Sequence, residues 1–403
     1  MPWPERSVRY HKRQTDCAIH HAYSRLAADA SAVARFDELL YCVRNRAPRL
    51  LEAPVVNEQH AGVEALINLS RFGNSHSRPV ASWSGTTSSW RLVVPSLAHH
   101  LVGRYQVPVF LASSWYSTEG TTPDVKRGWF VEHSFGASFR SLDLPIVMTR
   151  KMEHVFLASP DHLEIDYALR RAELLALDAP TELVRSVLST RMATDMTNGA
   201  FWRTVWSFFI ANTGTIDLAE IGPMIDFIQA IRHDRVAVET PDGMVELDPP
   251  EPAFSIKGRT VQSMLRLMRE WHRSLGAGGT AGRTWTPSPL QPMVLEEPGF
   301  DASDPPKRWQ MIELTNSAQL RAEGAALHHC VASYDDRCCR GLSRIWSLRL
   351  WQGEKLHHVM TIEVDPKRRA VVQARSRANR AASGKPLRLL QDWAARERLQ
   401  LAV

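Results

Sequence analysis

The thiol of Cys330 is the side chain of this sequence best suited to nucleophilic chemistry. A thiolate reacts readily only where a base or a cation lowers the pKa of its thiol. His329 is adjacent, but neighbouring residues of a helix point about 100° apart, which aims this ring poorly at the sulfur. A histidine from a following strand, His357 or His358, is a better-aimed base. We expect Cys330, His329 and Glu363 to be the catalytic candidates, although a free cysteine is more commonly a buried structural residue.

A second group of polar side chains begins at Tyr334, one helical turn after Cys330, and continues into the strands expected to follow the helix. Within the strands expected there, polar and apolar residues alternate, so a period of two places each polar set on one face of a sheet. Two guanidinium groups and an amide on one face can hold a phosphate or a carboxylate. Glu363 is either a general base or the counter-ion of Arg349, and the whole face is otherwise the solvated side of an antiparallel sheet. The expected ligand-binding residues are Tyr334, Arg349, Gln373, Arg375 and Asn379.

Soft metal ligands also occur in this stretch, since Cys338 and Cys339 follow His329 and Cys330. Their spacing is not that of a Cys-x-x-Cys pair, and adjacent residues of a helix diverge, which disfavours a zinc site. The sequence contains no phosphate-binding loop, dinucleotide fingerprint or His-Glu-x-x-His signature. We therefore expect no metal and no cofactor.

One helix and three strands must position these side chains. Residues 316–340 carry apolar side chains in alternating steps of four and three, which predicts a helix with one buried stripe. Asn316 and Gln319 can cap its start, and Gly341 suits the left-handed residue beyond its end. A final helix over 386–399 can cover the apolar face of the sheet. The expected strands, joined by short hairpin connections, are at about 344–351, 357–364 and 370–375.

The composition is that of an ordinary soluble globular protein. The chain has 403 residues, of which 44% are hydrophobic and 23% charged, and this length suggests two or three domains. No apolar run approaches the roughly 20 residues of a membrane helix, and the N-terminus lacks the layout of a secretion signal. The five cysteines are odd in number and scattered, which argues against a disulfide framework. We expect a cytoplasmic protein with reduced thiols and no membrane partner.

Positive charge is concentrated at the C-terminal end. Residues 341–403 contain 13 Lys and Arg against 5 Asp and Glu, whereas the whole chain has a net charge of only +6. A basic field of this kind attracts phosphate backbones or acidic partners. A solvated basic surface without a partner is the simpler alternative.

The remaining chain is predicted to be almost entirely helical. Residues 17–50 follow one long helical pattern, and helices succeed one another from 145 to 234, with a short strand pair over 236–256. The fold class expected is α+β: a large N-terminal all-helical array followed by a small module of helix, three-stranded antiparallel sheet and helix. The expected divisions are an N-terminal helical region over 1–94, a helical array over 95–275, a Gly- and Pro-rich linker over 276–307 and an α+β module over 308–403.

Four blocks of the C-terminal module carry a resemblance to one family: residues 308–320, 323–334, 341–349, and 372–375 followed by Asn379. The chain is similar to PcfJ-like proteins, which are known from conjugative plasmids, phages and bacterial chromosomes. The helical part is also similar to longer chromosomal members, so the resemblance extends from about residue 95 and is most specific over 309–380. Members often have Gly after Gln-Ala-Arg, where this chain has Ser376.

The resemblance implies mobile-element or conjugation biology and the handling of DNA, without an established reaction. We expect a factor that binds a nucleic acid or another polyanion through its basic strands and C-terminal tail. One alternative is a thiol-dependent hydrolase or transferase centred on Cys330. Another is an adaptor that binds a protein partner through the helical array.

Overall fold

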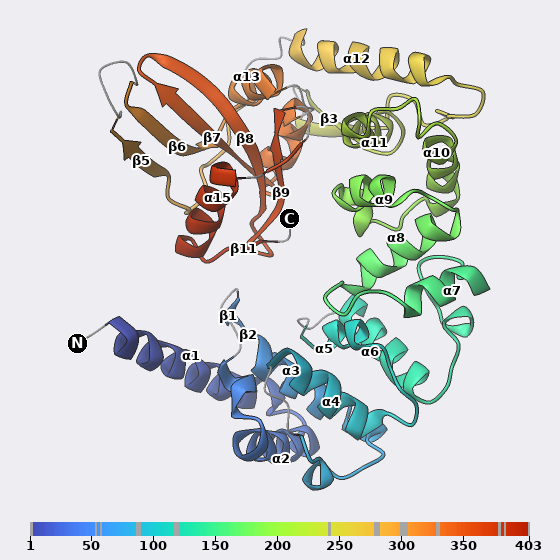
Figure 1. The fold of residues 1–403 in the computed structure, drawn as a ribbon, viewed down its shortest axis with the longest axis vertical. Coiled ribbons are helices and arrows are strands. Elements are labelled where there is room, and N and C mark those ends of the chain that lie inside the picture. Colours follow the sequence, from blue (N-terminus) through green and yellow to red (C-terminus); the bar gives the residue numbers. More distant parts are fainter. Residues whose placement is uncertain are drawn as a thin grey trace. The chain divides into compact units, whose positions relative to one another are not determined.

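The computed structural model describes residues 3–401 except 53–54, 57–58, 86–89, 117–120, 241–242, 278–282, 299–304, 328–330, 378–379 and 383. The chain divides into two compact units, residues 1–176 and 177–403, each described here by itself (Figure 1). This division does not test the four segments expected from the sequence, which remain a prediction.

The first unit is built almost entirely from helices around a buried α3 (Ala61–Arg71). The single helix expected over 17–50 is wrong, because the chain breaks between two helices. Asp29 begins the second of them, and its carboxylate accepts a hydrogen bond from the backbone N–H of Ala32 at 3.0 Å. A two-residue ladder, β1 (Val55–Val56) with β2 (Gln59–His60), also departs from an all-helical array. The other helices are α1 (Trp3–Leu26), α2 (Ala30–Arg46), α4 (Trp90–Val102), α5 (Ser113–Tyr116), α6 (Thr121–Ser134), α7 (Arg150–Leu157) and α8 (Ile165–Ala176).

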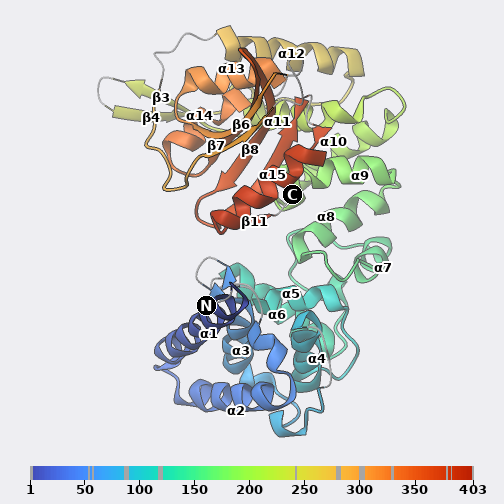
Figure 2. The ribbon, with the colours of Figure 1, turned by 60° about the vertical axis from the view of Figure 1, so that its left-hand side comes forward.

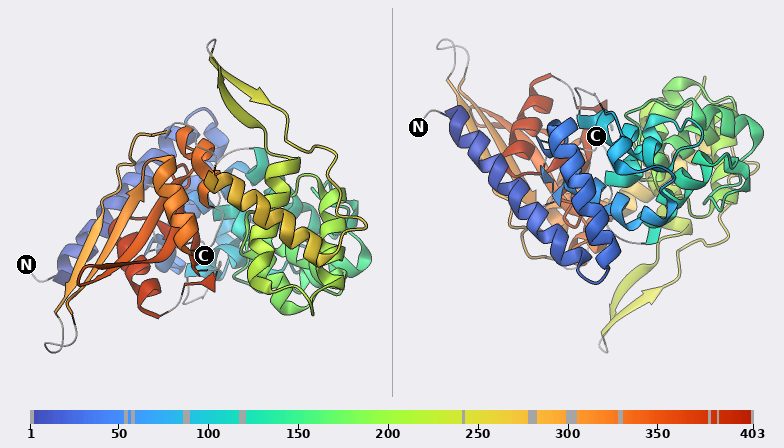
Figure 3. Two further views of the ribbon diagram at one scale, coloured as in Figure 1. Left: turned by 90° about the horizontal axis from the view of Figure 1, so that it is seen from above. Right: turned by 90° about the horizontal axis from the view of Figure 1, so that it is seen from below.

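The second unit begins with four helices and one hairpin. The strand pair expected over 236–256 is present as β3 (Val236–Thr240) and β4 (Gly243–Leu247), which pair antiparallel. Figure 3 shows this hairpin projecting from the neighbouring helices. Those helices are α9 (Thr181–Leu188), α10 (Gly199–Ala211), α11 (Ile221–Arg232) and α12 (Val261–Ala277).

Within the described residues, a seven-stranded mixed sheet and the helices on its faces form the rest of this unit. The three strands expected from the sequence are present as β7 (Arg344–Gln352), β8 (Lys355–Asp365) and β9 (Ala370–Ser376). A sheet of only three strands is wrong, because further strands lie on both sides of them. β5 (Met293–Glu297), within the expected linker, and β6 (Lys307–Leu314) extend the sheet beyond β7. β10 (Arg380–Ala381) pairs antiparallel with β9, and β11 (Gln400–Leu401) pairs parallel with it.

Helices cover both faces of this sheet. The helix expected over 386–399 is α15 (Gly384–Arg396), which lies across one face (Figure 2). Its Trp393 meets Trp346 of β7 with ring centroids 4.8 Å apart in a buried apolar layer. The opposite face meets α13 (Ser317–Leu327), whose Leu320 packs with Leu314 and Ile345 in a second apolar cluster. The polar face expected to be solvated is therefore covered in part by a helix.

The single helix expected over 316–340 is wrong in its second half. α13 ends at Leu327, a 3-10 turn covers Val331–Tyr334, and a short α14 (Asp335–Cys339) follows. The stripe of apolar residues is real, since Val331 and Cys338 join the same buried cluster as Leu320. Two short segments can bury the same stripe as one long helix, so the periodicity did not reveal the change of direction.

None of the helices in the described ranges is both long and apolar enough to cross a membrane.

Gly341 ends α14 as expected, with a φ of 67°. Its N–H donates to the carbonyl of Cys338 at 3.0 Å, and the next N–H donates to the carbonyl of Arg337 at 2.9 Å. We predict that Gly341→Ala lowers the free energy of unfolding by about 1 kcal/mol, because a side chain disfavours this left-handed conformation. Gly199→Ala is the control, since Gly199 lies in the first turn of α10 with space around it. Urea denaturation measures both, and equal effects would contradict the assignment.

His272 of α12 makes stability depend on pH. Burial lowers the pKa of this imidazole to about 4, and its Nε2 is buried without a hydrogen-bond partner among the described residues. The unfolded chain binds the proton more readily, with a pKa near 6.5, so protonation favours unfolding. We predict that stability is lost as the pH falls from about 6.5 towards 4. His272→Gln should reduce this loss in thermal melts across that range, and an unchanged pH profile in the variant would contradict the prediction.

Candidate functional site

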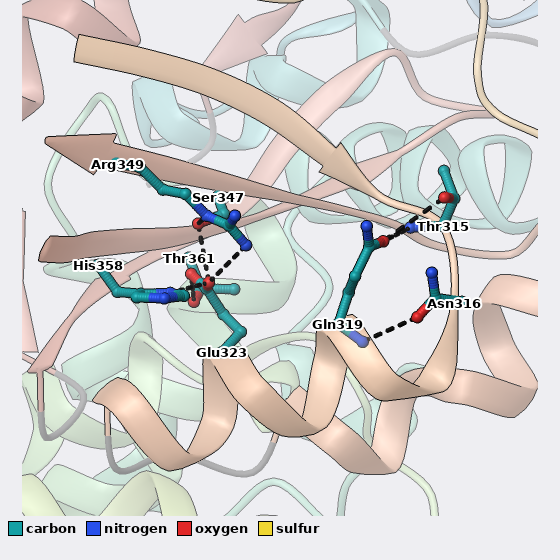
Figure 4. Close-up of polar contacts among 8 residues, drawn as sticks. All are labelled: Thr315, Asn316, Gln319, Glu323, Ser347, Arg349, His358 and Thr361. Atoms are coloured by element: carbon teal, nitrogen blue, oxygen red, sulfur yellow. Dashed lines mark hydrogen bonds and ion pairs between the residues drawn. The ribbon is translucent and has the colours of Figure 1, made fainter. Parts of the chain in front are cut away.

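The site on the covered face of the sheet begins with the start of α13. Asn316 Oδ1 accepts a hydrogen bond from the N–H of Gln319 at 2.9 Å, as the sequence predicted. Gln319 Oε1 accepts in return from the N–H of Thr315 at 2.7 Å, one residue before the position expected for a capping box. These contacts fix where α13 begins on the sheet (Figure 4). One turn later the helix presents Glu323 to β7 and β8.

Glu323 is a fully buried carboxylate that three strand side chains satisfy. Its Oε2 accepts hydrogen bonds from Ser347 Oγ at 2.8 Å and from His358 Nδ1 at 2.6 Å. Its Oε1 accepts from Thr361 Oγ1 at 3.0 Å. Figure 4 shows these side chains converging on Glu323 from the two strands. A carboxylate without partners would be costly at this depth, so the three donors are what allow Glu323 to be buried.

Arg349 completes this group, which we call the Glu323 cluster. Its Nη2 lies 3.7 Å from Glu323 Oε2, and its Nε donates to Ser347 Oγ at 3.1 Å. The guanidinium thus supports the serine that itself donates to Glu323. The side chains of Arg349 and His358 are 17% and 16% exposed, whereas that of Glu323 is 0% exposed. The cluster therefore has a buried anionic centre and a partly accessible cationic and imidazole rim.

An irregularity in the strand pairing brings His358 to this cluster. Ser347 lies opposite Thr361, but Arg349 lies opposite His358, so Val359 is an extra residue in β8. In a regular strand Thr361 and His358 would point to opposite faces, because they are three residues apart. The bulge puts both on the face of α13. The alternation of polar and apolar residues in the sequence cannot reveal a bulge. It therefore does not distinguish His358 from His357 as the better-aimed base.

Glu363 belongs to a different group on the same face. Its Oε1 accepts from Ser343 Oγ at 2.8 Å and lies 3.3 Å from Arg337 Nη2. Burial raises the pKa of Glu363, while Arg337 and Ser343 oppose that shift. Gln373 lies opposite Glu363 in the ladder between β8 and β9. The structure thus places Glu363 beside Arg337 rather than as the counter-ion of Arg349.

Tyr334 and Arg375 lie near this second group. Arg375 donates through Nη2 to the carbonyl of Ser189, from the helical part of the same unit. Burial lowers the pKa of Arg375, and the nearby Tyr334 and Asp226 oppose that shift. The guanidinium of Arg337 lies over the ring of Tyr334, 5.7 Å from its centroid. Arg349 and Arg375 therefore share a face of the sheet but have different partners.

Three expected residues, His329, Cys330 and Asn379, lie outside the described residues, as does His328. Their chemical roles stay predictions. Cys338 is described, and burial, with a smaller effect of Glu363, raises the pKa of its thiol to about 12. That thiol stays protonated at neutral pH and is a core group.

A hollow of about 610 Å³ opens beside Cys338, and none of the expected ligand-binding residues lines it. Trp285, Arg340 and Arg344 contribute to its lining. Within the described ranges, no three His, Cys, Asp or Glu side chains gather in a way that could hold a metal ion.

Sequence reasoning missed Glu323, Ser347 and Thr361 as members of a site. The alternation of polar and apolar residues in the two strands does mark Ser347 and Thr361 as members of the polar face. Glu323 could be recognised less easily. It is a charged residue four positions before Leu327, and residues four apart lie on the same face of a helix. A carboxylate at a position that faces the core is a reason to look for donors on the element opposite.

We predict that Glu323→Ala lowers the free energy of unfolding by about 3 kcal/mol, because it leaves two buried hydroxyl donors, the His358 imidazole and a guanidinium without their acceptor. Glu354→Ala is the control, since Glu354 lies exposed in the turn between β7 and β8. Chemical denaturation of both variants measures the difference. An effect of Glu323→Ala as small as that of the control would contradict the role given to this carboxylate.

The comparisons with known proteins bear on this part of the chain. A family model described as PcfJ-like protein matches residues 307–386, which include β6 to β10, α13 and both polar groups described above. The helical part, which was also expected to resemble the family, lies outside the matched residues. No curated protein matches the chain, and no solved structure matches it either. Residues 307–386 of this chain are therefore similar to PcfJ-like proteins, and we call them the PcfJ-like region.

Proposed function

We propose that the PcfJ-like region, together with the residues that follow it, binds a nucleic acid or another polyanion. The observation that carries the proposal is the concentration of charge, with 13 Lys and Arg against 5 Asp and Glu over residues 341–403. Phosphate backbones are recognised chiefly by such basic groups, whatever their sequence. The resemblance to proteins of plasmids and phages makes DNA the first polyanion to test.

The structure suggests which basic side chains would make the contacts. Arg349 and Arg375, expected from the sequence to hold phosphate, are engaged with Glu323 and with the carbonyl of Ser189. Lys367 and Arg388 are instead exposed. An exposed cation can approach a phosphate without first losing a partner inside the protein. We therefore assign the contacts to exposed groups rather than to the polar face of the sheet.

The turn that carries Lys367 has a defined conformation. Asp365 Oδ1 accepts hydrogen bonds from the N–H groups of Lys367 and Arg368, each at 2.9 Å. Arg369 follows with a φ of 45°, and its guanidinium donates to the carbonyl of Glu397 at 2.6 Å. A turn held in this way presents its side chains at lower entropic cost than a free loop.

The binding we propose depends on charge more than on reading bases. Trp351, an aromatic side chain close to the basic strands, donates through Nε1 to Gln310 at 2.9 Å. The guanidinium of Arg308 lies over its ring, 5.6 Å from the centroid. With one ring face engaged, this tryptophan is a poor platform for stacking a base.

We predict that the full chain binds a double-stranded DNA oligonucleotide and that affinity falls steeply as salt rises from 50 to about 200 mM, because phosphate contacts release counterions. Lys367→Gln combined with Arg388→Gln should make the slope of log affinity against log salt shallower by about 2. Fluorescence anisotropy measures the slope.

Arg150→Gln provides the matched control, since Arg150 is exposed on α7 in the first unit. It removes a positive charge far along the sequence from the PcfJ-like region and should leave the slope unchanged. Absence of binding at low salt, or an affinity independent of salt, would refute the proposal. The control removes one charge rather than two, so a loss of slope of about half that size in the control would show that net charge alone, rather than this region, is responsible.

A further inference from the structure

We propose that Glu323 and His358 form a proton-transfer pair, with His358 Nε2 as the proton acceptor and Arg349 as the binding group for an anionic substrate. This goes beyond the polyanion binding proposed above, because it assigns chemistry to the polar cluster that the exposed basic residues do not use. The substrate class is a molecule that carries a phosphate or carboxylate next to a hydroxyl or thiol group.

The first argument is the orientation of the imidazole. His358 Nδ1 lies 2.6 Å from Glu323 Oε2, and a carboxylate acceptor makes Nδ1 the nitrogen that carries hydrogen. Nε2 is then the nitrogen with a lone pair, and it has no hydrogen-bond partner among the described residues. A buried carboxylate that holds Nδ1–H in this way fixes the tautomer and ring orientation that a general base needs. Glu323 is the positioning residue in this arrangement.

The second argument is that Glu323 is itself held rigidly. Ser347 and Thr361 donate to its two oxygens from neighbouring strands, at 2.8 and 3.0 Å. The carboxylate is completely buried, so water does not compete for these contacts. A structural salt bridge would not require His358 to lie partly exposed, whereas a base must reach its substrate. His358 keeps 16% of its side chain accessible.

Arg349 supplies the charge that would hold an anion beside this base. Among the described residues, its Nε donates a hydrogen bond to Ser347 Oγ and its Nη2 lies 3.7 Å from Glu323 Oε2. A guanidinium has five N–H donors, so donors remain for a phosphate or carboxylate oxygen. Arg349 lies opposite His358 in the strand pairing, so both act at the same place on the sheet.

The step itself is a single proton transfer. The Nε2 lone pair forms an N–H bond as the O–H or S–H bond of the substrate breaks, and the electron pair of that bond stays on oxygen or sulfur. The imidazolium so formed keeps its Nδ1–H contact with Glu323, whose negative charge stabilises it. Reversal of the step returns the proton, so the pair needs no oxidant, reductant or further reactant.

The neighbouring histidine gives a built-in control. His357 precedes His358 in β8 and is also partly buried, but it has no carboxylate partner among the described residues. Diethylpyrocarbonate transfers an ethoxycarbonyl group to an unprotonated imidazole nitrogen, so its rate reports the availability of that lone pair. Peptide mass mapping of the full chain distinguishes the two positions.

We expect His358 to be labelled faster than His357 at neutral pH, and Glu323→Gln to slow the labelling of His358 about tenfold while leaving His357 unchanged. Inorganic phosphate should protect His358 and not His357. Equal labelling of the two histidines in the wild-type chain would overturn the proposal. Protection of neither by phosphate would overturn the anionic substrate class.

Nitrogen NMR of the wild-type chain keeps the proposal falsifiable even if Glu323→Gln does not fold. The proposal requires neutral His358 to carry its hydrogen on Nδ1, and finding it on Nε2 would overturn the assignment of the base. This readout needs neither DNA nor activity. Failure of the oligonucleotide binding described above would leave it unaffected, so the two proposals can fail separately.

Discussion

The PcfJ-like region depends on one interaction, the contact between the buried carboxylate of Glu323 on α13 and its hydrogen-bond donors on the sheet. Burying this group without partners would cost several kcal/mol, which is a large fraction of the stability of a domain. Ser347 and His358 donate to one oxygen of this carboxylate, and Thr361 donates to the other. The cost of burial is therefore offset only when α13 is aligned with β7 and β8 so that all three donors reach Glu323. The carboxylate therefore selects a single docking of α13 on β7 and β8, which apolar packing alone would specify less sharply.

Positive charge in and after the PcfJ-like region is of two kinds. Arg349 is directed to Glu323 and Arg375 to Ser189, whereas Lys367 and Arg388 are exposed. Inside the fold, guanidinium groups stabilise and orient their neighbours. At the surface, positively charged side chains attract a polyanion from a distance, and salt screens this attraction. Our proposals assign binding to the exposed groups and proton transfer to the enclosed cluster, which is consistent with the burial of each.

Features set by a few adjacent residues, such as helix caps, could be predicted from the sequence. Features set by the pairing of distant strands could not. Asn316 and Gly341 marked a helix start and a helix end because capping is a property of a few adjacent residues. The alternation in β7 to β9 located the strands. It could not reveal β5, which is recognised only by its pairing with β6, nor β10 and β11, which have two residues each. The bulge that brings His358 to Glu323 is likewise a property of two strands together, so the centre of the candidate site could not be predicted from one strand's pattern.

A double-mutant cycle between Glu323 and His358 tests the central claim most directly. Glu323→Gln, His358→Gln and the combined variant would be compared with the wild-type chain by chemical denaturation, with the free energy of unfolding as the readout. Our account predicts a coupling energy of about 1 to 3 kcal/mol, since His358 donates directly to the buried carboxylate of Glu323. Strictly additive effects of the two substitutions would show that the contact does not organise this region, and would contradict the account.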